Sequence, residues 1–356
     1  MIIVFEVKLK TLKEFFDKYE RRIGLAFLVG GFIFDNLTLR RVDFLLDNLV
    51  LLTYLAIVAL SIIAIDLKWE RVSQTAFYAM QFAIGGLFSG FIVFYFRSAA
   101  LTISWPFLLM LAAFFIGNEF FRRHYALLAF RIGIFFIAVF SYFIFSLPVV
   151  FNRLGADIFI LSGVCSLALI GGLMFFIKKK DIEHASSHYP LVIATVGAIY
   201  LIFNIFYFTN IIPPIPLALK EAGIYHRVER VAGGYSILDE KRPWYSIFTT
   251  KEVHLLTGES AYAFSSVFAP TKLESQIFHR WSFYDKRSNK WIEAVKIGFP
   301  IVGGRDAGYR GYSIKENIFP GRWRVDVITE RRQIIGRMNF RVVEAEISPN
   351  FKIIER

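Results

Sequence analysis

The sequence has only one cysteine among its 356 residues, so it cannot form an intrachain disulfide. Cys165 lies inside an apolar stretch, and any domain outside the membrane must therefore be held together by packing. The N-terminus lacks the long apolar core and small-residue cleavage site of a signal peptide, so we expect no cleaved leader. No recognised nucleic-acid-binding motif accompanies the net charge of +12, so we expect no nucleic-acid partner.

Hydrophobic residues make up 56% of the chain and gather between residues 23 and 210 in blocks of about twenty. A helix rises about 1.5 Å per residue, so such a block crosses the roughly 30 Å hydrocarbon core of a bilayer. The predicted spans are residues 23–39, 44–65, 74–96, 99–118, 125–151, 156–177 and 189–209. The first is the weakest because it is short and contains Asp35 and Asn36. The sequence therefore predicts an α-helical transmembrane bundle of about seven spans over residues 23–210.

Lysine and arginine in the short flanking segments predict the orientation of this bundle. With seven spans, thirteen basic residues fall on one side and four on the other. Because positive charge is retained on the cytoplasmic side, the N-terminus should be cytoplasmic and the C-terminal domain extracytoplasmic. In a bacterium with two membranes, the protein would be a multi-pass inner-membrane protein with a periplasmic C-terminal domain.

Residues 1–22 carry apolar side chains at helical spacing with lysines between them. Leu9, Leu12, Phe16 and Tyr19 mark the apolar side of this pattern. The pattern predicts a basic amphipathic helix on the cytoplasmic membrane face, or a helix packed against the loops of its own protein.

Prolines mark the exit from the last span. Pro213, Pro214 and Pro216 remove backbone donors and favour extended backbone, so a helix should end before them. Residues 211–260 are predicted to form a Pro-rich exit and connector, in which 217–230 leads away from the membrane through a short helix.

From about Tyr262 the hydrophobic period changes from helical to two. Alternation of apolar residues continues through runs around Trp281, Trp291, Trp323 and Phe340, with turn residues between the runs. Short alternating strands at this spacing predict an all-β, Ig-like antiparallel sandwich over residues 261–356.

Several short motifs in this region resemble one bacterial family. They are His279-Arg-Trp281, Gly303-Gly-Arg305, Gly308-Tyr-Arg310, Ser313-Ile-Lys315 and Gly321-Arg-Trp-Arg-Val325, closing on Phe340. Over residues 260–343 the chain resembles the DUF2914 domain, a family without an established function that often follows membrane segments. The resemblance implies a compact extracytoplasmic module and supplies no catalytic residue.

The densest polar cluster of the C-terminal half provides a candidate ligand site. Its residues are Arg305, Asp306, Tyr309, Arg310, Ser313 and Lys315, with His279 and Trp323 as further candidates. Arginines near aromatic rings can bind a carboxylate, a phosphate or a sugar acid through paired hydrogen bonds and ring stacking. Alternatively, Arg305 or Arg310 pairs with Asp306, Asp326 or Glu293, while His279 and Trp323 are core residues.

Two further polar sets carry hypotheses of their own. Arg324, Arg337 and Arg341 should face outward and form a basic sheet face, either solvated or close to anionic lipid or wall polymer. Inside the membrane, the costly residues are Asp47, Arg131 and Asn204, which are expected to pair, to reach the interface or to line a pathway. His184 and His188 lack the further ligands that zinc needs, so no metal or cofactor is predicted.

The favoured function is therefore non-catalytic. The helical bundle would anchor a β-sandwich that binds an envelope protein or an anionic polymer outside the membrane. One alternative is a transporter or channel with an extracytoplasmic regulatory domain. Another is an envelope enzyme that uses His279 with Arg305 or Arg310. The lipid bilayer is the one partner that composition itself requires, and homo-oligomerisation is left open.

Overall fold

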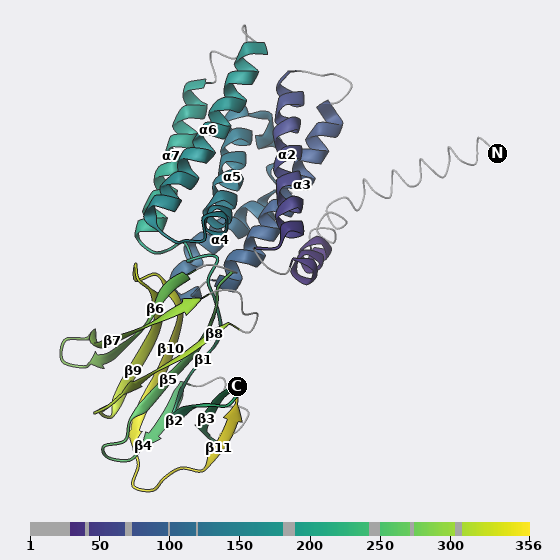
Figure 1. Cartoon of the computed structure of the whole chain (residues 1–356). Helices are drawn as coiled ribbons and strands as arrows, with labels where there is room; N and C mark the ends of the chain where they lie inside the picture. The colour runs from purple at the N-terminus through teal and green to yellow at the C-terminus, as the bar shows by residue number, and fades with distance from the viewer. Residues whose placement is uncertain are drawn as a thin grey trace, which may run out of the picture. The chain divides into compact units, whose positions relative to one another are not determined.

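The computed structural model describes residues 29–39, 43–67, 73–98, 100–118, 120–180, 189–241, 250–270, 274–302 and 308–356. These residues form two compact units. One contains most of the helices, and the other contains the β domain together with residues 95–107, 145–158 and 205–217. Figure 1 labels the elements of both units. The helix expected over residues 1–22 and the pair His184 and His188 lie outside the described residues.

The described part of the chain contains seven α-helices. They are residues 29–38, α2 (Leu45–Asp66), α3 (Ser73–Ser98), α4 (Leu101–Gly117), α5 (Leu128–Phe151), α6 (Ala156–Lys180) and α7 (Tyr189–Phe208). A short 3-10 helix, η1 (Phe121–Ala126), precedes α5.

Five of these helices are long and apolar enough to cross a membrane, namely α2, α3, α5, α6 and α7. They fit a multi-pass membrane protein. Helix α4 has 17 residues and contains Pro106, and the first apolar block is described only from residue 29 onward. The count of about seven spans, and the orientation derived from it, therefore stay predictions.

Helix α5 is the most buried of the five candidate spans. Ile132, Phe136 and Phe140 are completely buried, and the ring of Phe140 stacks on Phe203 of α7 with centroids 4.9 Å apart. The helix continues through Pro148 to Phe151. Pro148 therefore lies close to the C-terminal end of the helix.

Eleven strands follow in the described part of the chain. They are β1 (Ala218–Tyr225), β2 (Arg227–Val231), β3 (Gly234–Glu240), β4 (Lys251–Leu255), β5 (Ala261–Phe268), β6 (Glu274–Asp285), β7 (Lys290–Val302), β8 (Tyr309–Lys315), β9 (Gly321–Thr329), β10 (Ile334–Glu344) and β11 (Phe351–Glu355). They form three sheets with the orders β1-β5-β8, β4-β10-β9-β6-β7 and β11-β3-β2. The paired strands in the described part of the chain are antiparallel, except for β4 and β10, which are parallel.

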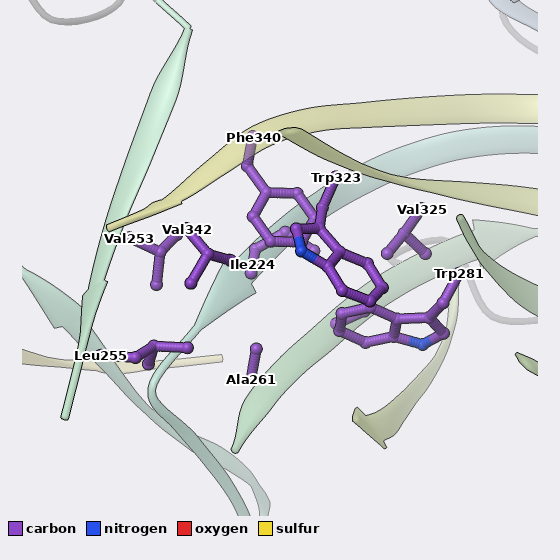
Figure 2. Close-up of a cluster of buried hydrophobic side chains, with 10 residues drawn as sticks. Ile224, Val253, Leu255, Ala261, Trp281, Trp323, Val325, Phe340 and Val342 are labelled. Atoms are coloured by element: carbon purple, nitrogen blue, oxygen red, sulfur yellow. The ribbon is translucent and has the colours of Figure 1, made fainter. Parts of the chain in front are cut away.

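Apolar clusters on both sides of β1-β5-β8 hold these sheets together. Between the five-stranded sheet and β1-β5-β8, Trp281, Trp323 and Phe340 pack with Ile224 of β1 and Ala263 of β5. Figure 2 shows the two indole rings lying close together beside Phe340. On the other side of β1-β5-β8, a second core joins side chains from β1, β2, β3 and β5, namely Tyr225, Val228, Ile237 and Phe264.

The strand β5 lies in the middle of this arrangement and contributes to both cores. Ala263 belongs to the first core and Phe264 belongs to the second. Seven of its eight residues are buried. A strand that is covered on both faces carries no polar side, which explains why its sequence, AYAFSSVF, does not alternate cleanly.

The region predicted as a connector differs from the expectation. Residues 218–255 supply the strands β1 to β4, and the short helix expected within 217–230 is wrong, because β1 and β2 occupy those residues. Small and charged residues such as Lys220, Glu221 and Gly223 hide the strand pattern of β1, whose pairing with β5 determines its conformation. Antiparallel sheets and a β-rich C-terminal region are confirmed, whereas the Ig-like topology stays a prediction.

Candidate functional site

The candidate ligand residues between 305 and 315 that the structure describes do not lie on one surface of the protein. Arg305 and Asp306 lie outside the described residues. Successive side chains of a strand point to opposite faces, so Arg310 lies on the opposite side of β8 from Tyr309 and Ser313. Ser313 is buried on the side that faces the five-stranded sheet.

His279 is the centre of a buried hydrogen-bond network. Its Nε2 lies 2.7 Å from Ser265 Oγ, and its Nδ1 lies 2.8 Å from Ser313 Oγ. Trp281 Nε1 also donates to Ser313 Oγ, at 3.0 Å. The imidazole is fully buried, and burial lowers its pKa to about 3. A neutral imidazole offers one donor and one acceptor nitrogen, so both nitrogens are satisfied by a hydroxyl group.

Trp323, the other aromatic candidate, is also a core side chain. It is completely buried, and its Nε1 donates to the carbonyl oxygen of Phe319 at 2.8 Å. Ring contacts with Phe283 and Phe319 cover the indole. Three of the candidate ligand residues, His279, Ser313 and Trp323, are therefore buried and hydrogen-bonded to other groups of the protein.

The polar residues proposed within the membrane lie at separate places in the helices. Arg131 of α5 forms an ion pair with Asp66 at the end of α2, with Nη2 and Oδ1 2.8 Å apart. Asn204 donates to the carbonyl oxygen of Tyr200 in the same helix at 2.8 Å. Asp47 lies in the first turn of α2 and is buried.

The outward side of the five-stranded sheet carries the densest charge in the described β domain. Strand register aligns Arg337 of β10 with Asp326 of β9, Asp326 with Arg280 of β6, and Arg280 with Lys296 of β7. These four residues form one row across the sheet. They lie on the side opposite to Trp281 and the other core residues, because neighbouring positions in a strand alternate.

A second and a third row extend this surface on the same side. The second row contains Asn339, Arg324, Ser282 and Glu293. The third contains Glu252, Arg341 and Arg322, with the pair Tyr284 and Trp291. We call the three rows the basic face. Its six basic side chains against three acidic ones leave a net formal charge of +3.

The charges of the first row meet at Asp326. Its carboxylate accepts two hydrogen bonds from Arg337, at 2.5 and 3.1 Å, and one from Arg280 at 2.7 Å. Arg324 stands 3.9 Å away as an ion pair without a hydrogen bond. Burial by itself raises the pKa of Asp326, but the hydrogen bonds from Arg337 and Arg280 outweigh it and lower the pKa below its usual value. The carboxylate is thus ionised beneath three guanidinium groups.

Aromatic rings support several cations of the basic face. The guanidinium of Arg324 lies 4.5 Å from the centre of the Trp291 ring, and that of Arg322 lies 4.8 Å from the Tyr284 ring. Lys296 Nζ lies 3.8 Å from the ring of Phe278. Such contacts hold the stems of long side chains in place, which reduces the entropy lost when their charged ends bind a partner.

Sequence reasoning anticipated part of this surface. Arg324, Arg337 and Arg341 were expected to face outward from the period of their strands, and they do. Arg280, Lys296 and Arg322 were missed, although they occupy the same alternating positions. Asp326 was considered a partner for Arg305 or Arg310, whereas in the described residues Arg280 and Arg337 bind it. Strand register brings these residues together, and no local pattern encodes it.

A further polar cluster joins β3 and β4. Glu240 is buried and accepts from His226 Nε2 at 2.8 Å and from the backbone nitrogen of His254 at 2.7 Å. His254 Nδ1 lies 3.1 Å from its other oxygen. Among the described residues, no group of three or more His, Cys, Asp or Glu is arranged to hold a metal ion.

Comparison with known families identifies the domain that carries the basic face. Residues 274–342, from β6 to β10, match DUF2914, described as a protein of unknown function. The resemblance drawn from the motifs between His279 and Phe340 is thereby confirmed. No curated protein matches the chain.

One solved structure is matched over most of the chain, with very little similarity. It is the alkylpurine DNA glycosylase AlkC of Pseudomonas fluorescens bound to DNA containing an abasic site analog, at 9% identity over 85% of this chain and 100% of that one. The TM-score is 0.21, so this match carries no argument about fold or function.

Proposed function

We propose that this protein is a membrane-anchored binding protein whose β domain holds an anionic envelope polymer on its basic face, outside the membrane. The main observation behind this proposal is the net formal charge of +3 in three rows of side chains on one side of the five-stranded sheet. Helices of membrane-spanning type supply the anchor. Cations arranged in rows across one side of a sheet suit an extended polyanion better than a small molecule enclosed in a cavity.

The exposure of individual cations supports this proposal. Lys296, Arg322 and Arg341 are exposed, and they form no ion pair with other residues that the structure describes. Their charges are therefore available to a partner. Attraction between solvent-exposed charges is screened by salt, with a Debye length of about 8 Å at physiological ionic strength, so binding should weaken as salt rises.

Binding of dextran sulfate to the full-length protein in neutral-lipid nanodiscs tests the proposal, with uncharged dextran as the control ligand. The variant combines Lys296→Gln, Arg322→Gln and Arg341→Gln. A matched control combines Arg230→Gln, Lys241→Gln and Lys352→Gln, which remove three exposed charges in or next to the separate sheet β11-β3-β2. We expect at least a tenfold loss of affinity, about 1.4 kcal/mol, in the first variant and little change in the second.

Equal affinities of the two triple variants would show that net charge, rather than the basic face, drives binding, and would overturn the proposal. Binding that is insensitive to salt would contradict it as well. If dextran sulfate does not bind while an acidic protein of the envelope does, the polymer is the wrong partner class.

The extracytoplasmic position is part of the proposal and has its own test. Reporters active only outside or only inside the cytoplasm are fused after Asn210 and at Arg356. Activity of the external reporter at both sites supports an odd number of spans. Activity of the cytoplasmic reporter would place the basic face inside the cell and exclude an envelope polymer.

A further inference from the structure

The side chains around Asp326, which come from the first and second rows of the basic face, carry more positive than negative charge. Arg280, Arg324 and Arg337 surround one carboxylate, that of Asp326, which leaves a local excess of +2. Each arginine side chain is 18–19% exposed and Asp326 is not exposed at all. Asp326 therefore lies beneath the guanidinium groups, and their outer edges are what remains accessible.

Hydrogen bonding in this cluster is incomplete. An ionised carboxylate has about four acceptor positions, and Asp326 uses three of them for Arg337 and Arg280. Arg324 has no hydrogen bond among the described residues, and its only ion pair is the 3.9 Å approach to Asp326. The Nε atoms of Arg280 and Arg324 are also buried without a hydrogen-bond partner. Leaving charged donors unpaired is unfavourable, so a second anion that contacted the accessible edges of these guanidinium groups would stabilise the cluster.

Electrostatics within the cluster agree with this reading. Burial is the largest cause of the lowered pKa of Arg324, and the like charges of Arg337 and Arg280 lower this pKa further, against the opposing effect of Asp326. The ring of Trp291 lies under the Arg324 guanidinium and fixes its plane. An oxyanion bound to Arg324 would reduce the repulsion between the guanidinium groups. The N–H donors of the planar Arg324 guanidinium would already be oriented for two parallel hydrogen bonds to it.

We infer that Arg280, Arg324 and Arg337, arranged around Asp326, form a discrete binding site for a phosphate or sulfate group. A tetrahedral oxyanion has three or more acceptor oxygens and can contact three guanidinium groups, whereas a carboxylate has only two oxygens and already occupies the centre of the cluster. A doubly charged phosphate monoester would neutralise the excess of +2. This inference rests on the proposed function, since it names the chemical group of the polymer that the basic face would recognise.

The test is calorimetric titration of the full-length protein in phosphatidylcholine nanodiscs with inorganic phosphate, with glycerol phosphate and with acetate. The variant is Arg324→Gln, which leaves all three hydrogen bonds of Asp326 in place and should fold. The matched control is Arg322→Gln, two residues away on the same strand and outside the cluster. We expect phosphate affinity to fall about tenfold or more in Arg324→Gln and less than about twofold in Arg322→Gln. Acetate should bind at least about tenfold more weakly than phosphate.

Equal losses in the two variants, or equal affinity for acetate and phosphate, would overturn the discrete site. If dextran sulfate still requires Lys296, Arg322 and Arg341 in that case, the proposed function stands without it. If dextran sulfate fails to bind as well, both ideas fail together.

Two further measurements ask whether the bound phosphate belongs to a lipid headgroup and whether the planar guanidinium of Arg324 is needed. Nanodiscs that contain phosphatidylglycerol should compete with inorganic phosphate only if a lipid headgroup is the ligand. Arg324→Lys keeps the charge and removes the planar fork, so full phosphate affinity in this variant would contradict recognition through three guanidinium groups.

Discussion

Two neighbouring residues of β6, His279 and Arg280, belong to polar clusters of opposite character. His279 points between the sheets, is neutral, and has a hydroxyl partner on each nitrogen. Arg280 points outward into a cluster of three cations with one anion. The inner cluster is satisfied by the protein itself, whereas the outer cluster has donors to spare. Such a difference separates a polar group that specifies the fold from one that is available to a ligand.

The largest expected effect is on the outer cluster. Asp326→Asn removes the only anion among three guanidinium groups, and breaking a buried charge cluster in this way costs about 3–5 kcal/mol. We expect a large drop in the thermal unfolding temperature of the full-length protein in detergent, followed by tryptophan fluorescence. The control is Glu293→Gln, an exposed carboxylate of the same face, which should change stability by less than about 0.5 kcal/mol. Equal effects would show that Asp326 is not the centre of the cluster.

The inner cluster should respond less strongly at neutral pH. His279→Leu removes two hydrogen bonds and leaves Ser265 without its imidazole partner, which costs about 1–3 kcal/mol. The same unfolding measurement at pH 7.5 checks the value. An unchanged unfolding temperature would mean that the hydrogen bonds of His279 do not stabilise the fold. The proposed difference between the inner and outer clusters would then be wrong for the inner cluster.

Acid should separate the two clusters further. The folded pKa of His279, about 3, lies below the unfolded value of 6.5, so the unfolded chain binds a proton that the folded chain does not. Stability contributed by neutral His279 is present above pH 6.5 and is lost as the pH falls towards 3, by up to about 1.4 kcal/mol per pH unit. Unfolding temperatures between pH 7.5 and 5 should fall less steeply in His279→Leu than in the wild type. Parallel curves would exclude this histidine as the source.

The smallest effect on stability is expected at the rim of the basic face. Arg341→Gln removes an exposed charge that forms no ion pair within the described part of the chain, so stability should change by less than about 0.5 kcal/mol. Affinity for dextran sulfate should nevertheless fall by about twofold to threefold, because one contact with the polymer is lost. A stability loss as large as that of His279→Leu would show that Arg341 stabilises the fold. Exposed charges of the basic face could then not be separated from buried polar residues by their effect on stability.

The helices were largely predictable because the membrane imposes a length on them. Apolar blocks of about twenty residues indicated α2, α3, α5, α6 and α7. Strands β6, β7, β9 and β10 were visible for a similar reason, since one side of each faces a core and the other does not. The strands β1 to β4 were missed, because short strands with charged residues and a preceding proline cluster resemble a linker.

The candidate site was predictable only in part. Strand period placed Arg324, Arg337 and Arg341 on the outward side, but which strands are neighbours cannot be read from period. The meeting of Arg280, Asp326 and Arg337 depends on the order β10-β9-β6, in which β6 lies beside a strand that follows it by some forty residues. The cluster around residues 305–315 looked dense in sequence, yet alternation divides its described members between the two sides of β8.

The burial of β5 on both sides has a consequence for how the family should be delimited. The stretch recognised by sequence similarity, residues 274–342, contains β6 to β10 and leaves out β5 and β1, against which the five-stranded sheet packs. A fragment cut to that stretch would expose Trp281, Trp323 and Phe340 to water. The stretch matched by the family, residues 274–342, is thus smaller than the packed β domain, whose first strand, β1, begins just after the prolines.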